Sequence, residues 1–382
     1  MALNEYRIFE KLLSSADICL NGDRPWDIKV KDEKMFDRVI CDGSLGLGET
    51  YMEGWWECQD IAEMISRVMS NDLESKLSTG LKLALGSKIG KAKVKKLFNP
   101  QSICQSKKDI SFHYDIGNDL YEAMLDKRMT YTCAYWKDAS TLDEAQEKKL
   151  DLICRKIGLE PGMRVLDIGC GWGSLMNYAA EKYGVICDGL TLSKEQAKAG
   201  QVIAESKGLD VNFILQDYRE YQPKEAYDRV VSVGMIEHVG AKNYREFFKV
   251  ANTFMKEDGL FLLHNIGSFE TTTTTDPWIN KYIFPNGEIP SLCQLSSAME
   301  PMFNLEDLHN IGEDYDKTLV AWYKNFDKAY NSGSLEQSNM FYRMWKYYLL
   351  SCAGAFRCRH LSVWQMVLSK VGTHKLECAR AS

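Results

Sequence analysis

The stretch Val165-Leu-Asp-Ile-Gly-Cys-Gly-Trp-Gly173 decides the fold class of this chain of 382 residues. An apolar run ends in Asp167, and three glycines spaced by one residue follow it. A buried strand that carries an acid to its carboxyl end, followed by a glycine turn and a helix, is typical of nucleotide-binding α/β domains. We therefore predict that Asp167, Gly169, Gly171 and Gly173 line a ligand pocket. The competing interpretation is an ordinary strand-to-helix turn without a ligand.

The spacing of the glycines separates two kinds of α/β enzyme. Dinucleotide-binding enzymes usually carry G-x-G-x-x-G, whereas G-x-G-x-G after an acid is typical of class I methyltransferases that bind S-adenosylmethionine. Apolar periodicity predicts strands at 164–168, 185–190, 211–215, 227–233, 259–266 and 362–369, and helices at 174–182, 194–206, 242–255, 317–330 and 338–358. This alternation predicts an α/β fold of the class I, Rossmann-like type with a mostly parallel seven-stranded sheet.

The chain is long enough for two domains. We expect a small, mainly helical domain at 1–70, a basic linker at 71–110 and a catalytic domain at 111–382. Regular patterns fail between 267 and 310, and a long insertion after a strand end is usually a lid or binding loop. The small domain is predicted to bind lipid or to contribute to a dimer.

An aromatic cluster marks the small domain. Tyr51, Met52, Trp55 and Trp56 follow helical spacing, which predicts one aromatic helix face. Core packing is the favoured use of this face, and contact with lipid is the alternative.

Charge is unevenly distributed along the chain. The net charge is −6, yet residues 75–108 hold nine lysines and no acid. Apolar residues interleaved among these lysines suit an anionic membrane surface, and a solvated linker helix is the equal alternative. Nucleic acid is not expected as a partner, because the chain is acidic overall and carries no recognised nucleic-acid motif.

Cysteine usage and hydropathy indicate the compartment. The twelve cysteines show no C-x-x-C pair, so we expect reduced thiols, no metal site and a cytoplasmic location. No signal peptide is evident, and no charge-free apolar run is long enough to span a membrane. A soluble or peripheral protein is therefore expected.

Polar residues at the predicted strand ends converge on one site, because ligands of open parallel sheets lie outside the carboxyl ends of the strands. Gln196, Asp217 and Tyr218 are suitable partners for an adenosine. Thr191 stands where an acid usually holds the ribose, so we expect Gln196 to take over that contact. Glu237 and His264 end adjacent central strands and are expected to face one small site.

Together with this pocket, seven further motifs resemble the bacterial cyclopropane-fatty-acyl-phospholipid synthases, a family that includes the mycolic acid cyclopropane synthases. The resemblance covers nearly the whole chain, and the amino-terminal domain favours the phospholipid-acting branch. The motifs are Gly43-Ser-Leu-Gly-Leu-Gly-Glu49, Gly54-Trp-Trp-Glu57, His113-Tyr-Asp-Ile-Gly-Asn-Asp119, Tyr131-Thr-Cys-Ala-Tyr-Trp136, Ser232-Val-Gly-Met-Ile-Glu-His-Val-Gly240, Asp276-Pro-Trp-Ile-Asn-Lys-Tyr-Ile-Phe-Pro-Asn-Gly287 and Cys352-Ala-Gly-Ala-Phe-Arg357.

The resemblance implies transfer of the S-adenosylmethionine methyl group to a cis double bond of a phospholipid acyl chain, loss of a proton and ring closure. It implies bound bicarbonate as the base, a homodimer, and peripheral association with the inner face of the cytoplasmic membrane. The residues expected to bind S-adenosylmethionine are Tyr131, Thr132, Asp167, Gly169, Cys170, Gly171, Gly173, Thr191, Leu192, Gln196, Gln216, Asp217 and Tyr218. The bicarbonate site maps onto Cys133, Glu237, His264, Ile266 and Tyr315.

Other expectations concern Cys352, His113 and Tyr114. The family assigns a thiol role to Cys352, but an apolar helix raises the pKa of a thiol, and we expect no covalent role. His113 and Tyr114 are candidates to close over the cofactor or to cap a helix. The alternatives are a related lipid or amine methyltransferase, a lipid- or cofactor-binding protein without catalysis and, disfavoured by the glycine spacing, a nicotinamide dehydrogenase.

Overall fold

The structure is a computed structural model that describes residues 2–71, 73, 117–272 and 274–373. The chain divides into two compact units, each described here by itself. The first comprises 1–99, 274–285 and 319–361, and the second comprises 100–273, 286–318 and 362–382. The predicted basic linker, His113 and Tyr114 lie outside the described residues.

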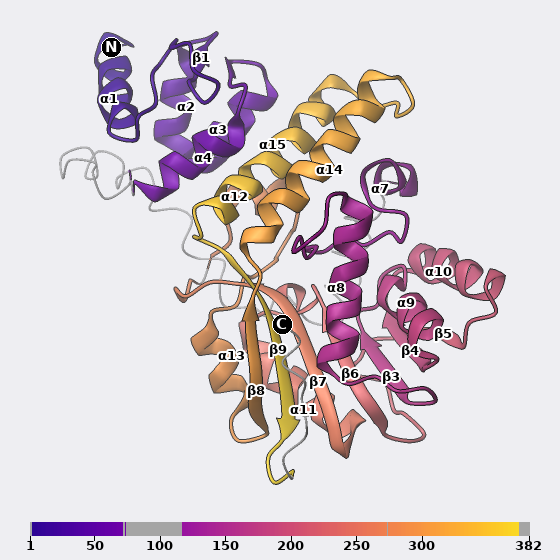
Figure 1. The fold of residues 1–382 in the computed structure, drawn as a ribbon. Coiled ribbons are helices and arrows are strands. Elements are labelled where there is room, and N and C mark those ends of the chain that lie inside the picture. Colours follow the sequence, from indigo (N-terminus) through magenta and orange to yellow (C-terminus); the bar gives the residue numbers. More distant parts are fainter. Residues whose placement is uncertain (1, 72, 74–116, 273, 374–382) are drawn as a thin grey trace. The chain divides into compact units, whose positions relative to one another are not determined.

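The second unit is built on a seven-stranded sheet of order β5-β4-β3-β6-β7-β9-β8 (Figure 1). Strands β5, β4, β3, β6 and β7 are parallel to one another, whereas β9 is antiparallel to its neighbours β7 and β8. Their bounds are β3 Arg164–Ile168, β4 Ile186–Thr191, β5 Val211–Leu215, β6 Tyr227–Val233, β7 Met255–Gly267, β8 Phe303–Asn310 and β9 Ser362–Lys370. The predicted mostly parallel seven-stranded sheet is therefore confirmed.

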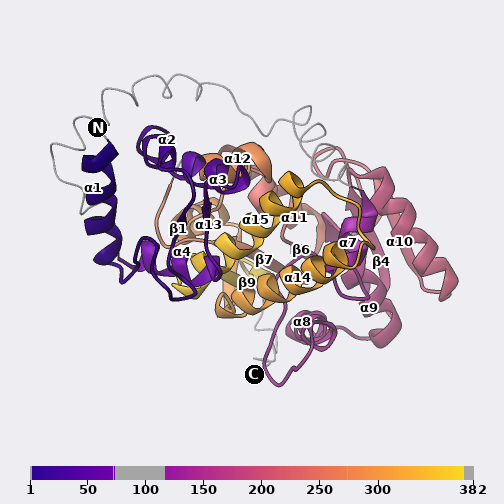
Figure 2. The same ribbon diagram turned by 90° about the horizontal axis from the view of Figure 1, so that it is seen from above.

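Helices cover both faces of this sheet. Because strand side chains alternate, Leu262 joins a core with α8 and α9 while its neighbour Phe261 joins another with α11 and α13. Helices α9 and α10 lie beside β4 at one end of the sheet (Figure 2). The helices of this unit are α7 Asn118–Met124, α8 Leu142–Lys156, α9 Ser174–Tyr183, α10 Lys194–Ser206, α11 Tyr244–Phe254 and α13 Leu292–Met299.

The insertion at 267–310 is more regular than predicted. It contains α12 (Pro277–Tyr282), α13 and the edge strand β8, and none of these three elements was predicted. Most side chains of β8 are partly or fully exposed, and this strand pairs on one flank only, with β9. An edge strand of this kind lacks the apolar alternation by which strands are recognised.

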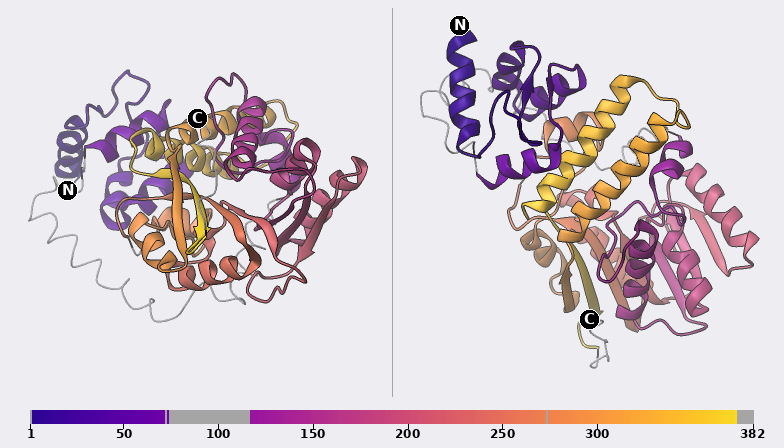
Figure 3. Two further views of the ribbon diagram at one scale, coloured as in Figure 1. Left: turned by 60° about the horizontal axis from the view of Figure 1, so that its bottom comes forward. Right: turned by 45° about the horizontal axis from the view of Figure 1, so that its top comes forward.

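The first unit is mainly helical, as expected for residues 1–70. It contains α1 Ala2–Ser14, α2 Lys34–Asp42, α3 Ser44–Met52, α4 Ile61–Ser70, α12, α15 Asn339–Arg357 and the two-stranded pair β1 Lys29–Val30 and β2 Trp56–Glu57. The division between the units falls within α14 (Glu313–Asn331), most of which lies beside α15 (Figure 3). Stacking of Tyr330 on Tyr342 at 4.3 Å joins these two helices. Residues 319–361, predicted to end the catalytic domain, thus pack with the first unit.

The predicted aromatic helix face of the first unit needs correction. Helix α3 ends at Met52, Gly54 turns the chain with φ 79°, and Trp56 begins β2. Core packing is nevertheless right for Tyr51 and Trp56, which are buried against each other at 4.9 Å. The two rings therefore meet because the chain turns at Gly54, and not because they share one helix face.

Candidate active site

The glycine loop after β3 turns as the sequence predicts. Gly169, Gly171 and Gly173 have φ values of 88°, 55° and 75°, a region that side chains with a Cβ rarely adopt. The backbone N–H groups of Gly169 and Cys170 both donate to the Leu190 carbonyl, at 2.9 and 3.0 Å. The loop is thereby fastened to the end of β4, and α9 begins directly after it.

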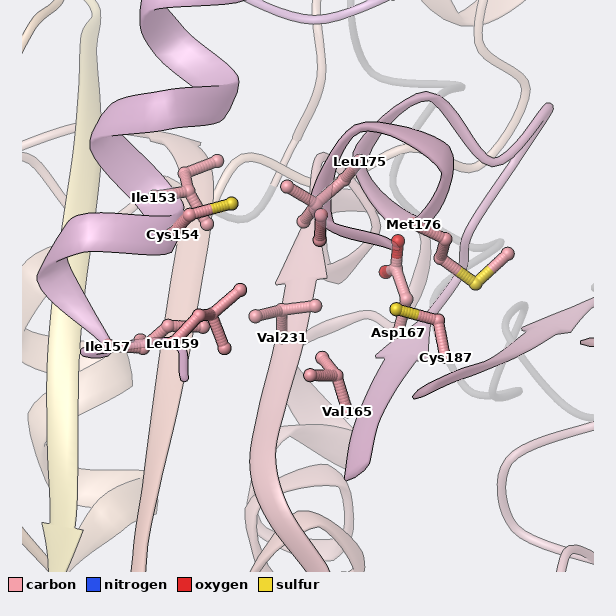
Figure 4. Close-up of a pocket in the computed structure, with 11 residues that line it drawn as sticks. Ile153, Cys154, Ile157, Leu159, Val165, Asp167, Leu175, Met176, Cys187 and Val231 are labelled. Atoms are coloured by element: carbon pink, nitrogen blue, oxygen red, sulfur yellow. The ribbon is translucent and has the colours of Figure 1, made fainter. Parts of the chain in front are cut away.

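Asp167 lies near the end of β3 and borders a small apolar pocket. Figure 4 shows its carboxyl group close to Cys187 and Met176. Burial raises the pKa of Asp167 to about 7, against the opposing charge of Lys149. Among the described residues, its Oδ1 has no hydrogen-bond partner. An unsatisfied buried acceptor at this position is available to a ligand donor.

The end of β4 leads into α10 through a local cap. Ser193 accepts the backbone N–H of Gln196, and Thr191 Oγ1 accepts that of Ser193, while Leu192 between them is partly exposed. Gln196 is buried, and its Nε2 has no partner among the described residues. This free donor fits the expected cofactor contact. Asp188, the acid on β4 closest in sequence to Thr191, accepts a hydrogen bond from Tyr227 at 2.7 Å.

The residues after β5 are held by local contacts. Gln216 Nε2 donates to the Glu220 carbonyl, and the buried Asp217 carboxylate pairs with Arg219 at 2.8 Å. Tyr218 is buried with its ring edge-to-face with Phe247 at 5.5 Å, so it belongs to the core. Their predicted roles at the cofactor remain predictions.

The segment before α8 reaches the ends of the central strands. Thr132 lies so close to Gly234, after β6, that a Cβ on this glycine would meet the threonine methyl at 2.7 Å. The Tyr131 ring packs on Tyr121 at 5.1 Å, and Tyr121 packs on Trp172 of the glycine loop at 5.1 Å. This places the predicted cofactor residues Tyr131 and Thr132 beside the loop. Tyr121 was not predicted, because an aromatic residue in a short helix carries no local signal.

A second group of predicted residues gathers at the ends of β6 and β7. Glu237 lies in the 3-10 turn Ile236–His238, and its Oε1 accepts the backbone N–H of Ile266 at 2.6 Å. Its Oε2 is buried without a partner among the described residues. Burial raises the pKa of Glu237 to about 7, despite the hydrogen bond from Ile266.

His264 lies two residues before Ile266 on β7 and is fully buried. Burial lowers its pKa well below the ordinary value, so the imidazole is neutral. Its Nδ1 lies 3.3 Å from Nε2 of Gln365, which is the residue opposite on β9. Gln365 is therefore a buried neighbour of the site that sequence reasoning missed.

Cys133 is connected to this group through a chain of contacts. The Cys133 thiol lies 3.7 Å from the Ile311 carbonyl, and Ile311 N–H donates to Val363 at 2.8 Å. Val363 pairs with Ile266 between β9 and β7. Tyr315 is buried four residues beyond Ile311, in the first turn of α14. These contacts connect Cys133 with Ile266, and the role of Tyr315 at the bicarbonate site stays a prediction.

Cys352 belongs to the first unit. It lies on α15, where burial raises the pKa of its thiol to about 12. A neutral thiol is a poor nucleophile, which agrees with the expectation that Cys352 forms no covalent bond.

Two buried polar residues of α8 were also missed. Gln146 and Lys149 are fully buried on the same face, and both bond to the segment that carries Thr132. The available signal was their spacing, which places them in the apolar stripe with Ala145, Leu150 and Ile153. Lysine in a Glu-Lys-Lys-Leu run normally indicates a solvated face, and this masked the signal.

The sequence and the fold match those of known proteins. Residues 101–366 fit the family described as "Mycolic acid cyclopropane synthetase". The "Cyclopropane-fatty-acyl-phospholipid synthase" of Escherichia coli (strain K12) is 50% identical over 377 residues, covering 99% of this chain and 96% of that protein. The chain belongs to the mycolic acid cyclopropane synthetase family. It is accordingly an S-adenosylmethionine-dependent methyltransferase of class I fold.

Solved structures of the family agree with this assignment. The cyclopropane synthase MmaA2 from Mycobacterium tuberculosis has a TM-score of 0.64 and 33% identity, covering 69% of this chain and 98% of that one. Mycolic acid cyclopropane synthase CmaA1, solved in complex with SAH and CTAB, has a TM-score of 0.64 and 34% identity, covering 69% and 97%. Within the described part of the chain, none of the helices combines the length and the apolar character needed to cross a membrane.

Proposed function

We propose that this family member converts cis double bonds of phospholipid acyl chains into cyclopropane rings. Similarity to the Escherichia coli phospholipid synthase runs along 99% of the chain, whereas the mycolic synthase structures cover 69% of it. The residues beyond the methyltransferase region therefore favour a phospholipid over another lipid. The single observation that carries the catalytic proposal is the buried Glu237, which accepts the Ile266 N–H through Oε1 and whose Oε2 has no partner in the described part of the chain.

The cofactor pocket is assigned to the loop after β3 and the ends of β4 and β5. The positive φ values of its glycines let the backbone approach a ligand closely. Asp167 Oδ1 and Gln196 Nε2 supply an acceptor and a donor that are unsatisfied among the described residues. This donor set fits the amino-acid and ribose groups of S-adenosylmethionine, and Tyr131 and Thr132 complete the pocket.

The base is assigned to bicarbonate held by Cys133, Glu237, His264, Ile266 and Tyr315. When bound there, bicarbonate supplies the acceptor for the proton that the substrate loses. The imidazole of His264 and the carboxyl group of Glu237 each offer a hydrogen-bond partner, and both residues are buried from water.

In the proposed reaction, methyl transfer is followed by proton loss and ring closure. The alkene electron pair attacks the methyl carbon, the bond from carbon to sulfur breaks, and S-adenosylhomocysteine leaves. The resulting carbocation loses a proton from the new methyl group, and the electrons of that C–H bond close the ring. A dry pocket protects the cation from water, and nearby aromatic faces stabilise positive charge.

Membrane association and assembly complete the proposal. The nine lysines of 75–108 would attract an anionic surface, which suits a peripheral enzyme on the inner face of the cytoplasmic membrane. A homodimer is proposed from the family resemblance alone.

The test is incubation of the full chain with S-adenosylmethionine and vesicles of unsaturated phospholipid, with and without bicarbonate. We expect cyclopropane acyl chains, formed much faster when bicarbonate is present. Equal turnover after removal of bicarbonate would contradict the base assignment, and modification of free fatty acids in preference to phospholipid would contradict the substrate.

A further inference from the structure

Lys149 is a fully buried lysine that has no role in the reaction proposed above. It lies on α8 with its side chain inaccessible to solvent. Its Nζ donates to Thr132 Oγ1 at 2.7 Å. Burying an ammonium group is costly unless nearby groups compensate. Its surroundings therefore indicate what it does.

The ammonium group lies within electrostatic reach of residues from both predicted sites. It interacts electrostatically with Asp126, Cys133 and Asp167, and it also acts on His264. Asp167 belongs to the predicted cofactor pocket, and Cys133 and His264 belong to the predicted base site. Burial lowers the pKa of Lys149 to about 8, so the group is mainly cationic at neutral pH.

Gln146 shows that α8 already holds the same segment without charge. Its Nε2 donates to the carbonyls of Thr130 and Thr132, at 3.2 and 2.8 Å. The backbone of the segment is therefore fixed by Gln146, one helical turn from Lys149. Gln146 thus holds the segment without a charge, whereas Lys149 adds a positive charge beside it.

We propose that Lys149 is a positioning residue that fixes the Thr132 hydroxyl and supplies the positive charge that favours anion binding at the Cys133 and His264 site. The inference rests on the proposed bicarbonate base. An anion beside the Glu237 carboxyl group meets no cation within the five residues assigned to its site, and Lys149 supplies one from α8. A unit charge several Å away in partly desolvated surroundings changes affinity by about tenfold or more.

The test measures bicarbonate binding to the full chain loaded with S-adenosylhomocysteine, by isothermal titration calorimetry, beside the melting temperature. Lys149→Met removes both charge and hydrogen bond, whereas Lys149→Gln keeps a donor toward Thr132. Gln146→Met removes the neutral contacts to the same segment. Lys148→Met changes the neighbouring, partly exposed lysine.

We expect both Lys149 variants to bind bicarbonate at least about tenfold more weakly, while Lys148→Met keeps the wild-type affinity. The melting temperature of Gln146→Met reports how much the neutral contacts to the segment contribute to stability. If Lys149→Met melts far below the wild type, the bicarbonate affinity of Lys149→Gln is compared with that of the wild type instead. Unchanged affinity in the Lys149 variants, beside a wild type that binds bicarbonate, overturns this role alone. A wild type that binds no bicarbonate overturns the base assignment as well, while leaving methyl transfer itself to be judged from the product.

Discussion

Glu237 combines two properties that a surface carboxylate cannot have together. One oxygen is committed to the Ile266 backbone at 2.6 Å, and the other is buried and free among the described residues. The first contact orients the group, and the second leaves it available for a ligand. Perturbed carboxyl groups of this kind gather at functional sites.

Replacing Glu237 by Gln should lower kcat by about 100-fold or more, because it disturbs the site assigned to the bicarbonate base and general acid–base catalysis typically contributes that much. His264→Ala should act similarly. Binding of S-adenosylhomocysteine should survive in both variants, since neither residue is assigned to the cofactor pocket. Turnover and calorimetry measure the two effects, with the exposed Glu246→Gln as the control. Loss of cofactor binding together with turnover would contradict the assignment.

The raised pKa of Glu237 also predicts a pH dependence of stability. Burial raises this pKa from 4.5 to about 7, so the folded protein binds the proton more tightly than the unfolded chain. The stabilisation is fully present below pH 4.5 and is lost as the pH rises through 7, a change of about 3 kcal/mol.

Unfolding free energies across this range check the pH dependence. Glu237→Gln should remove the part of the pH dependence that comes from Glu237. The free energy of unfolding of this variant should therefore rise relative to that of the wild type as the pH rises. Parallel curves for the two proteins would show that Glu237 does not titrate in this window.

At the scale of elements, burial on two faces made the central strands predictable. The central strands β3 and β6 begin and end at the predicted residues, and so does the edge strand β5, although its side chains are less buried. Strand β8 was missed because its exposed side chains do not alternate. The site residues at the strand ends could also be predicted from the sequence. Lys149 and Gln365 could not, because they lie on elements that are distant in the chain from those strand ends.

Helix α3 offers a sharp test of packing in the first unit. A Cβ at Gly48 would meet the Trp278 ring at 2.4 Å, whereas an unhindered Gly-to-Ala change in a helix stabilises by about 1 kcal/mol. We expect Gly48→Ala instead to destabilise by about 1–3 kcal/mol, because overpacking forces the ring to shift. Urea unfolding measures the change, with the exposed Ser44→Ala as control. A stabilised Gly48→Ala would show that the ring does not pack there.

For the whole molecule, similarity along 99% of the chain ties the methyltransferase unit and the helical unit to one relative. The fold of the second unit explains the use of S-adenosylmethionine, but it does not explain how a lipid reaches the site. We propose that the lysine-rich segment 75–108 brings the enzyme to an anionic lipid surface.

Neutralising Lys91, Lys93, Lys95 and Lys96 should weaken binding to anionic vesicles, and most strongly at low salt, where charges are least screened. Vesicle sedimentation with anionic and neutral phospholipids measures this. Turnover on detergent-dispersed substrate serves as the control, and we expect it to change little. Unchanged vesicle binding at low salt would leave the segment only a linker role.

The most direct test of the central claim follows the transferred methyl group itself. The full chain is incubated with unsaturated phospholipid vesicles and S-adenosylmethionine whose methyl group carries deuterium in place of all three hydrogens. Ring closure with loss of one methyl proton predicts a cyclopropane acyl chain that keeps two deuterium atoms in the bridging carbon, identified by mass spectrometry and by ring signals in NMR. A branch that keeps all three deuterium atoms, or an exocyclic methylene without ring signals, would contradict it.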